Sequence, residues 1–294
     1  MWQIFANNRE MNLTCKMMRV FVLMENTSTK EGIQTEHGLS LYIETSKHRL
    51  LSDTGQSALT LENACKMGVD LESVDTVVIS HGHYDHAGGL LSFASLNPKA
   101  DIYMQRSAAG AFYHDERYIG IDKEILKLPG LHLLDSDQII DEELSVFSGI
   151  RGRRLWPSGN RVLTEKIQGR DVQDTFGHEQ CLVIKDQGKT VLLSGCAHNG
   201  ILNILDRFRE LYGEEPDVVI SGFHMMKKSE YSPDEIRSIE ETAKELAGYK
   251  PMFYTGHCTS QPVIDLMLDI MPDNLKPIHA GDILELWYNN TNVK

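Results

Sequence analysis

Short runs rich in β-branched residues recur along the chain, and they limit its fold more than any other feature. They are bounded by Gly, Asp or Pro, as strands commonly are. Amphipathic stretches between them predict helices over 199–213, with Asn199 as a candidate N-cap, and over 232–248, where Ser232 and Glu235 form a capping-box pattern. Strands interleaved with helices predict an α/β fold. The runs cover residues 18–25, 39–45, 48–55, 75–81, 100–105, 180–186, 189–196, 216–224, 251–258 and 281–287.

The length of 294 residues lies within the range of one large α/β domain. We expect a single domain over 19–294, preceded by a disordered tail at 1–18. The segment 106–170 differs from its surroundings and predicts an irregular insertion, whose part 150–170 concentrates arginines in an acidic chain. Two interpretations of these arginines stay open. They belong either to a solvated surface insertion or to a flap that supplies cations to an anionic substrate.

Charge and cysteine usage narrow the class of protein. The 29 basic and 42 acidic residues give a net charge of −13, which argues against a broad nucleic-acid or anionic-membrane surface. The five cysteines are odd in number and form no C-x-x-C pair, which favours a reducing compartment over a disulfide framework. No apolar run reaches the roughly 20 residues of a membrane span. We expect a cytoplasmic protein that acts on a small molecule, without nucleic-acid or membrane partners.

Polar clusters follow several of the strand-like runs at the point where each run stops. Because neighbouring strands end at the same edge of a sheet, these clusters are expected to meet in space. Histidines, cysteines and carboxylates repeat among them, so the sequence predicts a metal site. The clusters read SDTG (52–55), SHGHYDH (80–86), SGCAH (194–198), SGFH (221–224) and TGHC (255–258).

The spacing within residues 81–86 separates two groups of ligands. His81 and His83 project to the same side of an extended segment and can hold one ion together. Asp85 and His86 follow one turn later and can face a second ion. Imidazole and carboxylate donors without paired thiolates suit zinc, iron or manganese in a catalytic site. Such an ion lowers the pKa of its water to about 7, which supplies hydroxide at neutral pH.

The segment HGHYDH resembles the H-x-H-x-D-H signature of the metallo-β-lactamase superfamily, and LLSDTG resembles its second-strand Asp motif. SGCAHNGILNIL, SGFH and YTGHCTS are similar to one subgroup, the metal-dependent hydrolases of β-lactamase superfamily II. That subgroup includes an archaeal synthase that condenses a dihydropterin with a ribofuranosyl-aminobenzene phosphate. The resemblance implies an αβ/βα sandwich of two mixed sheets flanked by helices. It also implies one or two divalent metal ions, with two zinc ions as our expectation and iron or manganese as alternatives.

When the ligand positions of the superfamily are transferred to this sequence, the resemblance implies a set of ligands for each ion. One ion would have His81, His83 and His198. The other would have Asp85, His86 and His257. Asp85 would also orient the nucleophile or accept its proton. Asp53 would lie behind the ligands and accept hydrogen bonds that fix the motif loop and a ligand imidazole.

The sequence departs from the superfamily pattern at Cys196, where many relatives have an Asp that bridges the two ions. Cys196 either bridges as a thiolate or packs as a thiol, and we favour packing. His178 lies where many relatives have the third histidine and is the rival of His198, which we favour.

Several weaker candidates remain beside these ligands. His224 is expected to face the pocket as a substrate contact or proton donor, with a structural role as the alternative. Cys258 is expected to pack. Tyr84, Met225 and Met226 line a substrate pocket or fill the core. The histidines without a motif context are interpreted as structural, namely His37, His48, His114, His132 and His279.

The function predicted from these residues is metal-dependent hydrolysis. A metal-bound hydroxide would attack a small, anionic ester, lactone or phosphoester. The first alternative is a synthase of the dihydropterin type, a transferase in which the ions activate a phosphate leaving group. The second is a non-catalytic binding protein, which the complete set of ligand residues opposes.

Overall fold

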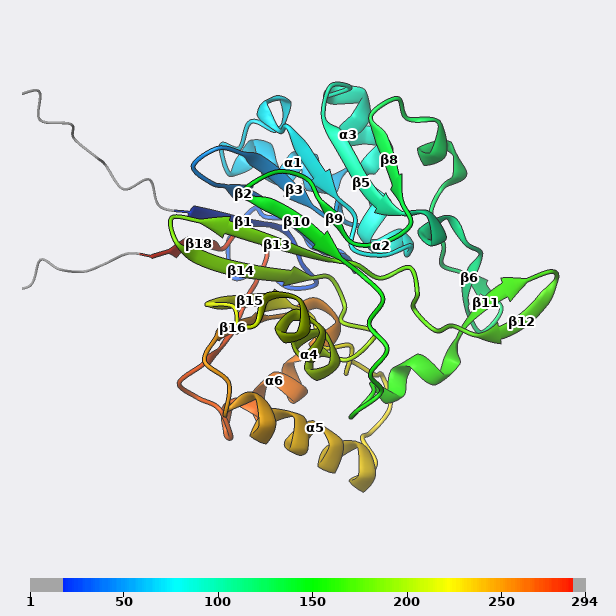
Figure 1. Cartoon of the computed structure of the whole chain (residues 1–294), viewed down its shortest axis with the longest axis vertical. Helices are drawn as coiled ribbons and strands as arrows, with labels where there is room; N and C mark the ends of the chain where they lie inside the picture. Colours follow the sequence, from blue (N-terminus) through cyan, green and yellow to red (C-terminus); the bar gives the residue numbers. More distant parts are fainter. Residues whose placement is uncertain (1–17, 288–294) are drawn as a thin grey trace, which may run out of the picture.

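The computed structural model describes residues 18–287. Two seven-stranded mixed sheets face each other, and helices cover their outer faces (Figure 1). This confirms the expected sandwich of two mixed sheets flanked by helices. The expected tail, residues 1–18, lies outside the described residues except for Met18, which begins the first strand.

The first sheet is antiparallel in its first four strands and parallel in the rest. In spatial order its strands are β18 (Ile283–Leu286), β1 (Met18–Met24), β2 (Ser40–Glu44), β3 (Arg49–Ser52), β4 (Thr76–Val78), β5 (Asp101–Gln105) and β8 (Leu131–Leu134).

The second sheet combines a parallel half with an antiparallel half in the same way. Its strands are β17 (Leu275–Pro277), β16 (Met252–Thr255), β15 (Val218–Ser221), β14 (Lys189–Ser194), β13 (Cys181–Asp186), β10 (Leu144–Phe147) and β9 (Gln138–Ile139).

Alternating side chains of the two sheets form the core between them, with Val20, Ile43, Leu182 and Ile220 among its buried members. Longer helices cover the outer face of the second sheet and bury an apolar stripe on it. The helices on the second sheet are α4 (Ile201–Tyr212), α5 (Pro233–Leu246) and α6 (Gln261–Leu268), and those packed against the first sheet are α1 (Leu59–Lys66), α2 (Tyr84–Ala87) and α3 (Leu90–Leu96). Short 3₁₀ turns complete the fold: η1 (Leu71–Ser73), η2 (Arg106–Ala109), η3 (Lys123–Lys127), η4 (Ser158–Val162) and η5 (His257–Thr259).

The predicted N-terminal end was correct for α5 and wrong for α4. Ser232 and Glu235 form the expected capping box at the start of α5. At α4 the N-cap is Gly200 rather than Asn199. The Asn199 amide instead donates to Glu179 and to the carbonyl oxygen of Phe176, so it fixes the preceding loop.

Much of the segment 106–170 is regular, contrary to the expected irregular insertion. It contributes β8 to the first sheet and both β9 and β10 to the second. Its other strands form a four-stranded sheet with β12, whose strands are β6 (Phe112–His114), β7 (Arg117–Tyr118), β11 (Leu163–Ile167) and β12 (Arg170–Gln173).

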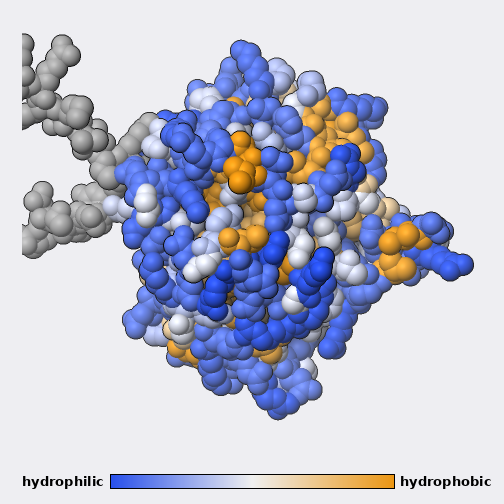
Figure 2. Space-filling view, in the orientation of Figure 1, coloured by the Kyte–Doolittle hydropathy of each residue, from blue (hydrophilic) through white to orange (hydrophobic). Residues whose placement is uncertain are grey.

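The β11–β12 hairpin projects from the body of the molecule (Figure 1). Ile167 and Val172 are exposed on this hairpin. Figure 2 shows an apolar group on the otherwise hydrophilic projection. All of the strands from β6 to β12 have two to five residues, too few for a clear alternating pattern.

Candidate metal centre

The segment 81–86 connects β4 to α2 at one edge of the sandwich. His81 and His83 lie in the loop, and Asp85 and His86 lie in the single turn of α2. Gly82 allows the loop to pass close to η2, since a Cβ there would lie 2.4 Å from the carbonyl oxygen of Ala108. The local sequence thus folds all four polar side chains toward the interior, where each is buried.

His81, His83 and His198 form one triad of donors. His198 follows β14 of the second sheet, and its Nε2 lies 3.3 Å from Nε2 of His81. One ligand atom from each of the three residues falls within 4.8 Å of the other two. The triad therefore joins the first sheet to the second.

Asp85, His86 and His257 form the other triad. His257 begins η5, directly after β16. Its Nε2 lies 3.2 Å from Nε2 of His86 and 3.4 Å from Oδ2 of Asp85. His86 Nε2 lies 3.7 Å from the same carboxylate oxygen. These distances bring together the residues that the sequence assigned to a second ion.

Cys196 lies between the two triads rather than packing apart from them. Its Sγ is 3.2 Å from Nε2 of His86. It also groups within 4.8 Å with His81 and His86, and separately with His257 and Cys258. The sulfur thus lies where a bridging donor would lie, whereas burial raises the pKa of the Cys196 thiol well above its ordinary value, as expected of the packed thiol that we favoured.

Hydrogen bonds on the side of the ring away from the cluster orient four of the imidazoles. Each ring uses Nδ1 for this contact, so Nε2 faces the cluster, as is typical of metal-binding histidines. The contacts are His81 with Ser80 Oγ at 2.9 Å, His86 with Asp53 Oδ2 at 2.7 Å, His198 with Asn160 Oδ1 at 3.0 Å and His257 with Asn26 Oδ1 at 2.9 Å.

Asp53 has the position expected of it. One carboxylate oxygen accepts the backbone N–H of Ser80 at 2.7 Å, and the other lies 2.7 Å from both Ser80 Oγ and His86 Nδ1. A single buried carboxylate therefore fixes the motif loop and one imidazole together. Asn160 and Asn26 have the equivalent role for His198 and His257, and neither was predicted because both lie far from the motifs.

His178 is close to the cluster but has both ring nitrogens engaged. Its Nδ1 accepts the N–H of Gly82 at 3.1 Å, and its Nε2 lies 3.1 Å from Oδ2 of Asp174. These bonds leave its ring in a supporting position, whereas Nε2 of His198 points at His81. The geometry favours His198 over His178 as a ligand.

A sequence model of the metallo-β-lactamase superfamily matches residues 34–232, which is more than half of the chain. The chain belongs to the metallo-β-lactamase superfamily. The chain is similar to Tm1679, whose crystal structure is described as that of a metal-dependent hydrolase of the β-lactamase superfamily. The two sequences are 32% identical and the structures superpose with a TM-score of 0.76, over 92% of this chain and 99% of Tm1679.

Two archaeal relatives from Methanocaldococcus jannaschii extend the similarity. An uncharacterised protein is 31% identical over 220 residues, or 71% of this chain and 80% of that protein. The 7,8-dihydropterin-6-methyl-4-(β-D-ribofuranosyl)-aminobenzene-5′-phosphate synthase is 26% identical over 296 residues, or 91% of this chain and 96% of the synthase. The superfamily scaffold thus includes relatives named for hydrolysis and for synthesis.

The donor spacing fits divalent ions of the kind that superfamily members bind. Zn–N bonds of about 2.0–2.1 Å in tetrahedral geometry separate two ligand nitrogens by about 3.3–3.4 Å. The nitrogen pairs His81–His198 and His86–His257 lie 3.3 and 3.2 Å apart. Nε2 of His83 is also buried without a hydrogen-bond partner among the described residues, which is costly in a closed core.

The electrostatics of the triads differ. Burial and neighbouring imidazoles lower the pKa of His81 and His198 well below the ordinary value, and that of His83 to about 3. Burial also lowers the pKa of His86, but the charges of Asp53 and Asp85 outweigh it and raise that pKa to about 9. Burial and the neighbouring imidazoles thus favour neutral rings in the first triad, the form in which imidazole binds metal, whereas the carboxylates of Asp53 and Asp85 favour a proton on His86 that an ion would have to displace.

His37 and His224 lie beside the triads. Nε2 of His37 is 3.3 Å from Oδ2 of Asp85, although the sequence placed this histidine among the structural ones. The ring of His224 lies 4.0 Å from that of His198, and its buried Nδ1 has no hydrogen-bond partner among the described residues. No motif surrounds His37, so only the folded loop could reveal it.

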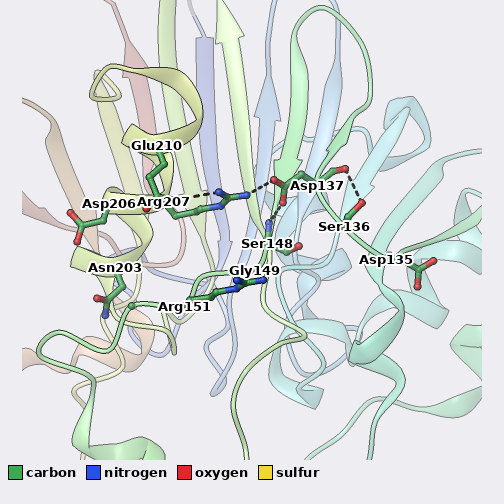
Figure 3. Close-up of a pocket in the computed structure, with 11 residues that line it drawn as sticks. Asp135, Ser136, Asp137, Ser148, Gly149, Arg151, Asn203, Asp206, Arg207 and Glu210 are labelled. Atoms are coloured by element: carbon green, nitrogen blue, oxygen red, sulfur yellow. Dashed lines mark hydrogen bonds and ion pairs between the residues drawn. The ribbon is translucent and has the colours of Figure 1, made fainter.

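A separate polar cleft of about 900 Å³ lies beside α4 and the loop 148–152 (Figure 3). Most charged side chains that line this cleft form ion pairs, such as that between Arg207 and Asp137 at 2.8 Å. Nearby, Arg154 pairs with Asp206 and Glu245. These pairings support a structural role for the arginines involved, and the histidine cluster remains the candidate site.

The described residues contain no helix that is both long and apolar enough to cross a membrane.

Proposed function

We propose that this protein is a metal-dependent hydrolase of a small, anionic ester, lactone or phosphoester. The observation that carries the proposal is the convergence of two donor triads on the Cys196 sulfur. The similarity to Tm1679, named a metal-dependent hydrolase, supports it. Free buried thiols beside the centre also favour a cytoplasmic, reducing environment.

Two divalent ions would be held by this chain, and zinc suits the mixture of imidazole, carboxylate and sulfur donors. His81, His83 and His198 would hold one ion. Asp85, His86 and His257 would hold the other, and the Cys196 sulfur lies between the two sets of donors. When bound, such ions make water a strong nucleophile at neutral pH and stabilise developing negative charge.

The chain's own residues would position the reactants. The pKa of Asp85 lies well below its usual range because His86 and His257 outweigh the opposite effect of burial, so its carboxylate is ionised. Asp85 would orient the attacking water and accept its proton. His224 would face the substrate, since its half-buried ring lies 4.0 Å from that of His198 at the edge of the first triad.

A synthase activity is the second candidate. The 26% identical relative that covers 91% of this chain is named as a dihydropterin synthase, which joins two substrates. In that case the same residues would hold the ions that stabilise a phosphate leaving group. Turnover would require a second organic substrate.

Metal content and a substrate panel test the proposal. Protein purified without chelator should contain about two equivalents of zinc, iron or manganese by elemental mass spectrometry. It should hydrolyse at least one member of a lactone, carboxylic ester and phosphoester panel, and D85N should abolish this activity while H114Q retains it. Turnover only when a dihydropterin and a phosphorylated arylamine riboside are supplied together would favour the synthase. A chain that binds no metal after reconstitution would contradict both.

A further inference from the structure

The side chain of His37 covers the solvent side of the second triad. It lies in the loop between β1 and β2, and 41% of its side chain is exposed, whereas Asp85, His86 and His257 are buried. Its Nε2 lies 3.3 Å from Oδ2 of Asp85, and its ring lies 4.9 Å from the ring of His257. One ligand atom each of His37, Asp85 and His257 falls within 4.8 Å of the others.

The backbone on the N-terminal side of His37 is fixed by the Glu36 carboxylate. This carboxylate accepts the backbone N–H groups of Gln56 and Ser57 at 2.9 and 3.0 Å and the Ser57 hydroxyl at 2.6 Å. Three hydrogen bonds to one carboxylate hold the loop onto the turn that follows β3.

The C-terminal side of His37 is fixed by close packing. A Cβ on Gly38 would lie 2.8 Å from the carbonyl oxygen of Asp85, so only glycine fits without displacement. The next residue, Leu39, donates its backbone N–H to the same oxygen at 3.2 Å. The position of His37 over Asp85 is therefore built into the loop on both sides.

Asn26 links this loop to His257. Its Oδ1 lies 2.9 Å from Nδ1 of His257 and accepts the N–H of Gly38 at 3.3 Å. Its Nδ2 donates to the carbonyl oxygen of His257 at 3.0 Å. One side chain thus holds both the ligand imidazole and the residue after His37, so the two histidines are positioned as one unit.

We propose that His37 is a further protein ligand of the second ion, binding through Nε2 from the solvent side. The inference rests on the proposed metal centre and adds a donor that lies outside its motifs. An imidazole in this position would raise the affinity of the second triad for its ion.

The alternative is that His37 only orients Asp85 through their hydrogen bond. Two substitutions separate these roles. H37A removes both the imidazole and the hydrogen bond, whereas the H37Q amide can still donate to Asp85 but is a poor ligand for zinc or cobalt. H114Q is the matched control because His114 is exposed on β6 and pairs only with Asp115 among the described residues.

The test is titration of the metal-free full chain with Co²⁺, followed by absorption, and with Zn²⁺ against a chromophoric chelator. In wild type and H114Q, two equivalents should bind. In both H37A and H37Q, only one of the two should weaken, by about tenfold or more, with altered cobalt d–d bands for that equivalent. Circular dichroism of the metal-free variants checks that they fold.

Two results would overturn the inference while the proposed hydrolase stands. Either H37Q binds both equivalents like wild type, which makes His37 a positioning residue, or both variants do, which removes any role in metal binding. A wild-type chain that binds fewer than two ions would instead contradict the proposed dinuclear centre, and the role of His37 with it.

Discussion

The carboxylate of Glu179 accepts the backbone N–H of His198 at 2.6 Å in the interior of the protein. The same carboxylate accepts the backbone and side-chain N–H groups of Asn199 at 2.9 and 2.8 Å. Glu25 forms the corresponding bond to the backbone of His257 at 2.5 Å. Each triad therefore has its C-terminal histidine held at the backbone by a buried carboxylate.

Substitution E179A should destabilise the fold and the first triad together. It leaves three N–H groups without their partner, and we expect a loss of about 3 kcal/mol in the free energy of unfolding. Urea denaturation measures this loss, and zinc competition should show weaker binding. E214Q, at an exposed glutamate, is the control. A stability equal to that of wild type would show that these bonds contribute little.

Substitutions at His198 and His178 should have different effects on metal content. H198A removes a nitrogen 3.3 Å from His81 and should retain about one ion of two. H178A removes only supporting hydrogen bonds and should retain about two ions, with about 1–2 kcal/mol lower stability. Elemental analysis of both variants decides between them. The reverse pattern would make His178 the ligand.

Cobalt spectroscopy should identify the sulfur at the centre of the cluster. If Cys196 binds as a thiolate, the Co²⁺ form should show a near-ultraviolet thiolate charge-transfer band that C196S loses. C65S, at an exposed cysteine, should keep the band. Loss of the band in C258S instead would assign the sulfur to Cys258, and no band in wild type would return Cys196 to the packed thiol.

Stability should depend on pH through His48, far from the cluster. This ring bonds Asp75 at 2.9 Å and Asp141 at 2.8 Å. Burial lowers the pKa of His48, but these two carboxylates outweigh it and the pKa is raised. The resulting stabilisation is complete below the ordinary histidine pKa of about 6.5 and is lost as pH rises through the raised value.

The variant H48N measures this contribution. Its thermal midpoint should fall below that of wild type at about pH 5.5 and approach it at about pH 8.5. A difference that is independent of pH would mean that the charge on His48 contributes nothing.

The strands of both sheets were largely predictable because their β-branched runs are long enough to carry a pattern. The first strand, expected over 18–25, occupies Met18–Met24, and that expected over 180–186 occupies Cys181–Asp186. Strands such as β7 and β9 have two residues and hold their places through pairing with distant segments, which no local pattern encodes. The same limit explains the misjudged segment 106–170.

The candidate site was predictable where its residues lie in motifs. The set that the sequence assigned comes together in space, and Asp53 makes the contacts expected of it. His37, Asn26 and Glu179 were missed because each reaches the cluster through tertiary packing. The role of Cys196, bridging thiolate or packed thiol, stays a prediction, because the sequence shows that an Asp is absent but not where the sulfur points.

The division of each triad between the two sheets has a consequence for how the protein is made. His257 lies late in the chain, and among the strands described only β17 and β18 follow it. A ribosome-bound chain that has not yet reached this residue lacks a donor of the second triad, even when β1 to β15 are complete. If the second triad holds an ion, its full set of donors therefore exists only after residue 257 has been synthesised.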